Sequence, residues 1–160
     1  MNIAYYHCSV YGNGAMVAEE FKRIMAIRGI TVTVQHMRDA RPKELPPADL
    51  YIFSSPGRIG KPIGKARRFL KKVKLPAGSK YAILTTEGAP QPNKKTGKMP
   101  TEEEIAKWQR VRPIMDELLM EKGLKKVGEA TVLVTGMKGP LEEGWQKKVE
   151  TFSEIIISLQ

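Results

Sequence analysis

Six residues near the start of the chain have the types and spacing of a phosphate-binding loop: Ser9, Val10, Tyr11, Gly12, Asn13 and Gly14. An apolar run over residues 3–8 precedes them, and an amphipathic stretch that begins near Ala15 follows them. The pattern predicts a strand, a tight loop and a helix whose free N–H groups and positive dipole end face the loop. A phosphate suits such a place, with Ser9 and Asn13 as further donors. A plain β-α turn, with glycines for geometry only, is the other interpretation.

Two more predicted strands end in loops that contain glycine. Residues 49–54 lead into a loop over residues 55–61, and residues 80–85 lead into a loop over residues 86–90. Ligands bind beyond the carboxyl ends of the strands in open parallel sheets, so these loops and the first one are expected to meet around one ligand. The candidate binding residues in them are Ser55, Pro56, Gly57, Arg58, Ile59, Gly60, Thr86, Glu87 and Gly88.

The elements that must position these loops alternate along the chain. Further strands are predicted over residues 30–35, at the edge of the sheet, and over residues 127–135. Helical periodicity follows the first, third, fourth and fifth strands. This alternation predicts an α/β fold with a parallel sheet covered by helices on both faces, in one domain over residues 1–160.

Local signals predict details of the second half of the chain. A capping box at residues 101–104 predicts a helix start, and Pro113 is expected to interrupt that helix. Trp108 is expected to belong to the core. Pro140 is expected in the first turn of the last helix. The connection over residues 90–100 is long enough for a flap, although its sequence also suits a docking loop or a disordered segment.

The net charge of +10 comes from one part of the chain. Residues outside 50–101 carry 15 basic and 16 acidic side chains, whereas those inside carry twelve basic side chains and one acid, Glu87. Such asymmetry suggests an anionic ligand or partner, and a solvated basic surface is the alternative. The twelve basic residues are Arg58, Lys61, Lys65, Arg67, Arg68, Lys71, Lys72, Lys74, Lys80, Lys94, Lys95 and Lys98.

Composition also bounds the compartment and the chemistry. Cys8 is the one cysteine, lies in an apolar run and is expected to be a buried thiol, which suits a reducing cytoplasm. We expect no signal peptide and no membrane span, because no apolar run is long enough. His7 and His36 are the only histidines, so no metal-binding cluster is expected.

The loops bear a resemblance to known sequences. Ser9, Gly12 and Asn13 match the flavodoxin phosphate loop, Ser/Thr-x-Thr-Gly-x-Thr, while Tyr11 and Gly14 stand where that loop has threonine. The Ser-x-Tyr-Gly form is similar to the flavodoxin-like quinone reductases of the Trp-repressor-binding-protein group. Residues 56–60, Pro-Gly-Arg-Ile-Gly, also resemble that group's Pro-Thr-Arg-Phe-Gly. The chain therefore resembles the flavodoxin-like family over nearly its whole length.

This resemblance implies a three-layer sandwich with strand order 2-1-3-4-5, and FMN as the cofactor. The FMN phosphate would contact the N–H groups of residues 10–14 and the Ser9 side chain. The flavin ring would lie between the loops over 55–61 and 86–90, with Ile59 on one face and no aromatic residue from either loop. A peptide group at Gly57 or Gly60 would bond flavin N5, because glycine lets the peptide flip.

The sign of the charge suggests how such a flavin would work. Flavodoxins that carry electrons are usually acidic, whereas the predicted flavin loops here are basic. We expect Arg58 and Lys61 to stabilise anionic reduced flavin and to attract a redox partner protein or an anionic electron donor. Glu87 is a candidate acid or base by its location alone. The sequence does not decide between an electron carrier and a small FMN-dependent oxidoreductase, or between a monomer and a dimer.

A flavodoxin fold without flavin is the competing interpretation. The basic segment over residues 58–98 would then bind an acidic protein or nucleic acid. The absence of loop threonines and of a ring-stacking aromatic residue favours this alternative, and the convergence of three glycine loops opposes it. Few aromatic residues lie among the basic ones and no nucleic-acid motif is present, which argues against nucleic acid.

Overall fold

The computed structural model of the chain describes residues 1–159. Five parallel strands form one sheet in the order β2-β1-β3-β6-β7, which confirms the expected order once two short strands in a hairpin are counted. The sheet strands are β1 (Asn2–His7), β2 (Thr31–His36), β3 (Leu50–Phe53), β6 (Lys80–Gly88) and β7 (Lys125–Val134). As expected, β2 lies at an edge of the sheet.

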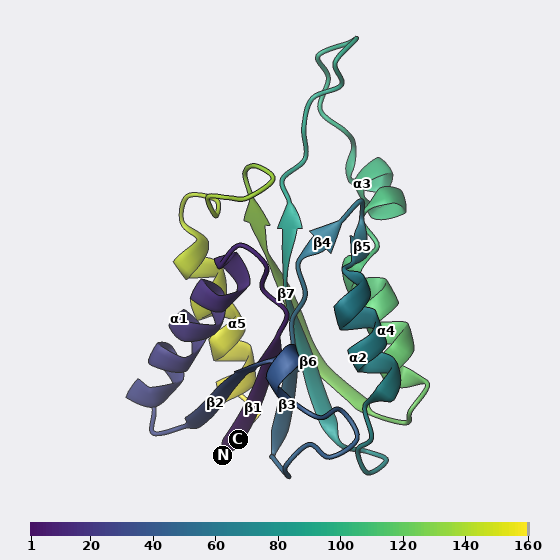
Figure 1. The fold of residues 1–160 in the computed structure, drawn as a ribbon. Helices are drawn as coiled ribbons and strands as arrows, with labels where there is room; N and C mark the ends of the chain where they lie inside the picture. Colours follow the sequence, from purple (N-terminus) through teal and green to yellow (C-terminus); the bar gives the residue numbers. More distant parts are fainter. Residues whose placement is uncertain (160) are drawn as a thin grey trace.

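Helices cover both faces of this sheet (Figure 1). Side chains alternate along β1, so that Ile3 and Tyr5 pack with one pair of helices and Ala4 and Tyr6 with the other. Cys8 is buried, as expected. Helices α1 and α5 lie on the first face, and α2 and α4 on the second. The helices are α1 (Asn13–Ile27), α2 (Gly64–Lys72), α3 (Glu102–Trp108), α4 (Val111–Met120) and α5 (Trp145–Ile157), with a 3-10 turn, η1 (Met37–Asp39), after β2.

Two of the predicted loops have more regular structure than expected. The loop over residues 55–61 contains a hairpin of β4 (Gly57–Arg58) and β5 (Lys61–Pro62). The predicted start of the loop over residues 86–90 is wrong, because β6 continues through Gly88 and stays paired with β7. Because side chains alternate along a strand, Glu87 points to the face of the sheet opposite to that of Thr86.

The helix boundaries correct two expectations. The capping box at Thr101 is present, but the chain breaks after Trp108 rather than at Pro113. Pro113 lies in the first turn of α4, where a missing N–H costs no hydrogen bond. The last helix begins at Trp145 and not at Pro140, because residues near Pro140 run beside β7, with Leu141 bridged to Val134.

The connection over residues 89–100 rises above the carboxyl edge of the sheet (Figure 1). Its tip is closed by Asn93, whose side-chain oxygen accepts hydrogen bonds from the N–H groups of Lys95 and Thr96 at 2.8 and 3.1 Å. No residue of this connection lines the cavity described below, so the expectation of a flap has no support in this structure. Among the described residues, no helix is long and apolar enough to cross a membrane.

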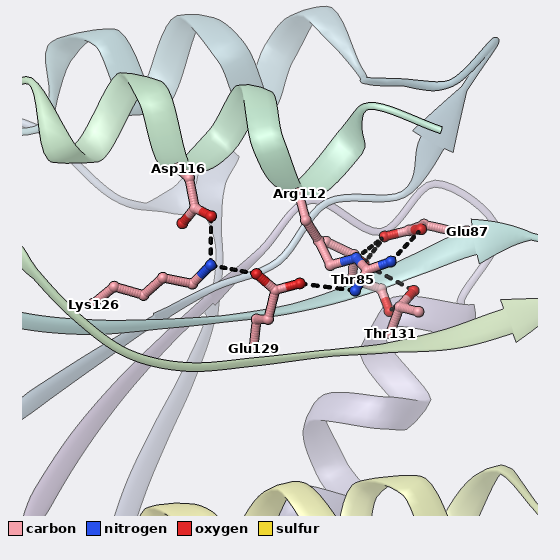
Figure 2. A network of polar contacts seen from close by, with 7 residues as sticks. All are labelled: Thr85, Glu87, Arg112, Asp116, Lys126, Glu129 and Thr131. Atoms are coloured by element: carbon pink, nitrogen blue, oxygen red, sulfur yellow. Dashed lines mark hydrogen bonds and ion pairs between the residues drawn. The ribbon is translucent and has the colours of Figure 1, made fainter. Parts of the chain in front are cut away.

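A network of charges joins α4 to β6 and β7 (Figure 2). Arg112 Nε lies 2.8 Å from Glu87 Oε2, and its Nη1 lies 2.8 Å from Glu129 Oε2. Lys126 links Glu129 to Asp116. Burial alone would raise the pKa of Glu129, but Lys126 and Arg112 together hold that pKa below its usual range. The network fixes the start of α4 against the end of β6.

Removing the arginine should therefore destabilise the fold. Arg112→Met leaves Glu87, which is 2 % exposed, without its positively charged partner and with only the Thr85 hydroxyl as a donor. We expect the free energy of unfolding in urea to fall by about 3 kcal/mol, the low end of the range for buried pairs because Arg112 is partly exposed. Adding Glu87→Met should restore part of that loss. A double variant no more stable than Arg112→Met alone would contradict this account of the network.

Candidate functional site

A cavity of about 540 Å³ opens at the carboxyl edge of the sheet, where the three predicted loops meet. Its wall combines the loop after β1, the β4–β5 hairpin, the end of β6, the α3–α4 junction and the loop after β7. The lining residues that the sequence analysis singled out are Ser9, Val10, Tyr11, Asn13, Gly14, Pro56, Gly57, Arg58, Ile59, Gly60, Thr86 and Gly88.

The loop after β1 presents unpaired backbone donors to this edge. Gly12 precedes α1 with φ of +95°, and its N–H donates to Ser9 Oγ at 3.0 Å. The N–H groups of Asn13, Gly14 and Ala15 find no acceptor within residues 1–159, and no acid lies in the first turn of α1. These free donors and the helix dipole make this point attractive to an anion.

Two histidines hold the peptide groups of Ser9. The Ser9 N–H donates to His7 Nδ1 at 3.2 Å, and His36 Nε2 lies 3.0 Å from the Ser9 carbonyl oxygen. The Arg38 N–H donates to His36 Nδ1, so Nε2 carries the proton and donates to Ser9. Burial, together with the nearby His36 and Arg38, lowers the pKa of His7 from 6.5 to about 4. His7 is therefore neutral near pH 7 and able to accept.

The loop after β7 closes on the first loop. Asn13 Nδ2 donates to the Lys138 carbonyl oxygen at 3.2 Å, and Lys138 Nζ lies 5.6 Å from the centre of the Tyr11 ring. Gly139 has φ of +115°, and a Cβ there would be 3.0 Å from Asn13 Oδ1. One Asn13 donor is thus engaged within the chain, which leaves its other amide hydrogen for a ligand.

The β4–β5 hairpin forms the opposite wall. Ile59 and Gly60 both have positive φ, of 51° and 71°, as a two-residue type I′ turn requires. This conformation is strained for a β-branched residue such as Ile59. A Cβ on Gly60 would lie 2.1 Å from the Trp108 carbonyl oxygen, and Arg110 N–H donates to Gly60 O at 2.6 Å. The hairpin is thus docked against the end of α3.

Exposed apolar side chains surround the mouth of the cavity. Trp108 is 57 % exposed, so the expectation that it belongs to the core is wrong. It lines the cavity because α3 ends there and docks on Gly60. Apolar side chains gathered around one concave site are typical of a binding surface. The exposed apolar residues in the lining are Val10, Tyr11, Ile59, Trp108 and Met137.

Two buried polar atoms in the wall have no hydrogen-bond partner among the described residues. They are Thr86 Oγ1 and Gln109 Oε1. Both residues line the cavity, and Thr86 is 2 % exposed. Buried polar groups are normally paired, so two polar positions in the wall of the cavity lack the partner that such groups usually have.

Three of the singled-out residues shape the site without lining it. Gly12 turns the first loop, and Ser55 Oγ accepts from the Ile63 N–H at 3.3 Å behind the hairpin. Glu87 lies in the charge network described above and is buried away from the cavity. Arg58 is the one charged residue in the lining, and Lys61 lies outside it. The lining residues that sequence reasoning missed are Ile63, Trp108, Gln109, Val134, Gly136 and Met137.

Comparisons with known proteins bear on the fold. No protein-family model and no curated protein matches the sequence. Among solved structures, flavodoxin 2 of Bacillus cereus is 19 % identical over 100 % of both chains, with a TM-score of 0.73. A Fusobacterium nucleatum flavodoxin bound to flavin mononucleotide is 10 % identical, with a TM-score of 0.65, and the match covers 99 % of this chain and 98 % of that one.

A larger protein also contains this arrangement. The rubredoxin oxygen:oxidoreductase of Desulfovibrio gigas is 13 % identical, with a TM-score of 0.69. The match covers 99 % of this chain but only 35 % of that one, so this chain corresponds to about a third of it. At such identities the likeness establishes the fold alone, and that fold is flavodoxin-like, as the sequence resemblance implied.

Neutral His7 predicts acid sensitivity of the first loop. Because its pKa is lower in the folded chain, the unfolded chain binds the proton more tightly, and stability falls as the pH drops from 6.5 toward 4. His7→Asn keeps an acceptor near Nδ1 but does not titrate. We expect its melting temperature to fall less than that of the wild type across this window. Parallel melting curves for the two proteins would exclude His7 as the cause.

Backbone strain at Ile59 predicts that a residue that tolerates positive φ stabilises the fold at this position. Asn favours positive φ, and Ile59 is 80 % exposed, so Ile59→Asn loses little burial. We expect the free energy of unfolding to rise by about 1 kcal/mol, because a non-glycine residue in this region costs roughly 1–3 kcal/mol. Ile59→Val keeps the branched Cβ and serves as the control, with no gain. A gain in Ile59→Val equal to that in Ile59→Asn would show that strain is not the reason.

Proposed function

We propose that this protein binds FMN in the carboxyl-edge cavity and works as a redox protein. The observation that carries the proposal is the meeting, around one cavity, of an anion-binding helix start, an apolar rim and two unpartnered polar atoms. FMN has the matching parts: a phosphate, a flat apolar ring system and polar groups along one edge of the ring. The likeness to flavodoxin structures supports this choice among nucleotides.

The residues present fit the cofactor. The free N–H groups of residues 13–15 and the Ser9 hydroxyl would hold the phosphate, since Ser9 Oγ accepts from Gly12 and still has its hydrogen to donate. Ile59 and Trp108 would contact the ring system. Thr86 Oγ1 and Gln109 Oε1 would pair with polar groups on its edge. Trp108 supplies the aromatic residue whose apparent absence favoured the flavin-free alternative.

The chain's own charges would tune the reduction of the flavin and attract the electron donor. Bound FMN would supply the electron transfer. Arg58 is the only charge in the lining, so it would favour a ligand that gains negative charge. We propose that the electron donor is anionic as well, since Lys61 and Lys138 follow lining residues of the same cavity and make no ion pair within residues 1–159.

Binding of FMN compared with riboflavin tests the phosphate part of the proposal. Riboflavin has the same ring but no phosphate, so we expect FMN to bind more tightly in a fluorescence-quenching titration. Ser9→Ala should weaken FMN about tenfold, because a hydrogen bond to a charged group contributes roughly 1.5–3 kcal/mol. It should leave riboflavin binding unchanged, as should the remote control Ser158→Ala for both ligands. Equal affinity for the two flavins would contradict a phosphate site.

Trp108 tests the ring part separately. We expect Trp108→Ala to weaken both FMN and riboflavin by about tenfold, since an aromatic contact of this kind contributes roughly 1–3 kcal/mol. Trp108→Phe should retain most of the affinity. The control is Trp145→Phe on α5, outside the cavity lining. Unchanged flavin affinity in Trp108→Ala would remove Trp108 from the site.

The midpoint potential of the bound flavin tests the role of charge. Arg58→Gln removes a positive charge from the wall, so reduction becomes less favourable and the potential should fall. A loss of ~1 kcal/mol corresponds to about 20 mV for a two-electron couple. Lys61→Gln on the same hairpin lies outside the lining and should lower the potential less. An unchanged potential in Arg58→Gln would refute the tuning role of this residue.

A further inference from the structure

A second cavity lies behind the first loop, on the α2 side of the sheet. Its volume is about 240 Å³, and Cys8 and His36 are in its wall. It is separated from the carboxyl-edge cavity by the turn at residues 8–9, because Cys8 lines one cavity and Ser9 the other. None of the flavin-contact residues named above belongs to it.

Four cations surround this second cavity, and no acid lines it. Lys65, Arg68 and Lys72 stand on one stripe of α2, at the spacing that places helical side chains on the same face. Arg38 comes from η1 on the facing side. Within the described residues the only ion pair made by any of the four is Arg38 with Asp39, at 3.7 Å, and both side chains are exposed. Such a pair contributes little.

Three of these cations act electrostatically on the Cys8 thiol. Burial raises the pKa of the Cys8 thiol, whereas Lys65, Arg38 and Arg68 each act to lower it. Cys8 lines the cavity together with these three cations, which come from two elements. All four cations are exposed and line one cavity, so an anion in the cavity would be attracted by several positive charges at once.

The wall also contains apolar surface. Met37 is 4 % exposed and Phe69 6 % exposed, and both line this cavity. Its volume exceeds that of a phosphoryl group but lies below the roughly 300–1,000 Å³ of typical drug-sized pockets. Cations beside an apolar floor suit a small molecule with a phosphoryl group and a compact apolar part.

We propose that this cavity is a second anion site, which binds a small organic phosphate through Arg38, Lys65, Arg68 and Lys72. The ligand's apolar part rests on Met37 and Phe69. The site is independent of the FMN proposal, because it shares none of the flavin-contact residues. His36 joins the two sites physically, since it lines this cavity and its Nε2 lies 3.0 Å from the Ser9 carbonyl oxygen.

Calorimetric titration with phenyl phosphate and with inorganic phosphate tests this site, at 0.15 M NaCl and without added FMN. Phenyl phosphate should bind more tightly than inorganic phosphate, because of the apolar floor. Arg68→Gln with Lys72→Gln should weaken phenyl phosphate about tenfold or more, as expected when two charge-assisted contacts are lost. Lys71→Gln with Lys74→Gln is the matched control, with the same charge change outside the cavity, and should change affinity less than twofold.

Other outcomes would overturn the proposal. Equal loss in the two double variants would indicate general attraction to a basic surface. Equal affinity for phenyl phosphate and inorganic phosphate would contradict a preference for an organic ligand. No detectable binding of either would contradict the site itself. Loss of phenyl phosphate binding in Ser9→Ala, with the Arg68 and Lys72 variant unaffected, would place the anion in the carboxyl-edge cavity instead. Binding of heparin alone, unchanged in both double variants, would favour an extended polyanion partner.

The folded state of each variant is checked by its melting temperature. Lys72 and Arg68 are exposed, so their substitution should leave the melting temperature near that of the wild type. If the Gln variant is destabilised, Arg68→Lys with Lys72→Arg keeps the charges and should keep phenyl phosphate binding. Loss of binding in this charge-conserving variant, with a normal melting temperature, would contradict a site based on charge.

Discussion

Parallel pairing of β1, β3 and β6 is the constraint on which the rest of the structure depends. It brings the carboxyl ends of these strands to one edge, so the segments that follow them share a wall. β1 is buried on both faces and therefore fixes the first loop against two hydrophobic layers. The charge network of Arg112 and Glu87 then holds the start of α4 beside the end of β6. The strand ends and the start of α4 thus position the loops that form the site.

Much of this arrangement could be predicted from residue patterns. The alternation of strands and helices indicates a parallel sheet, and Ser9, Gly12 and Gly14 between a strand and a helix indicate an anion-binding turn. These features are local, because glycine conformation and helix dipoles depend on neighbours in the sequence. The convergence of the loops follows from topology alone, and twelve of the fifteen singled-out residues line the cavity.

The rest depends on contacts between distant segments. Helix α3 has seven residues, too few for its sequence to indicate which side of it is buried. Trp108 reaches the cavity because Gly60 packs against its carbonyl group. Glu87 faces the charge network because β6 continues to Gly88, so that Thr86 and Glu87 point to opposite faces of the sheet. The loop after β7 joins through Asn13 and Lys138, which are 125 residues apart in sequence. No local pattern signals such pairs.

The central claim is that one ligand engages both the start of α1 and the junction of α3 and α4. Backbone amide NMR during an FMN titration tests it most directly. We expect the amide signals of residues 13–15 and of Trp108 and Gln109 to shift together and to saturate at one FMN per chain. Shifts confined to one of these two groups, or no saturable shift at all, would contradict the account.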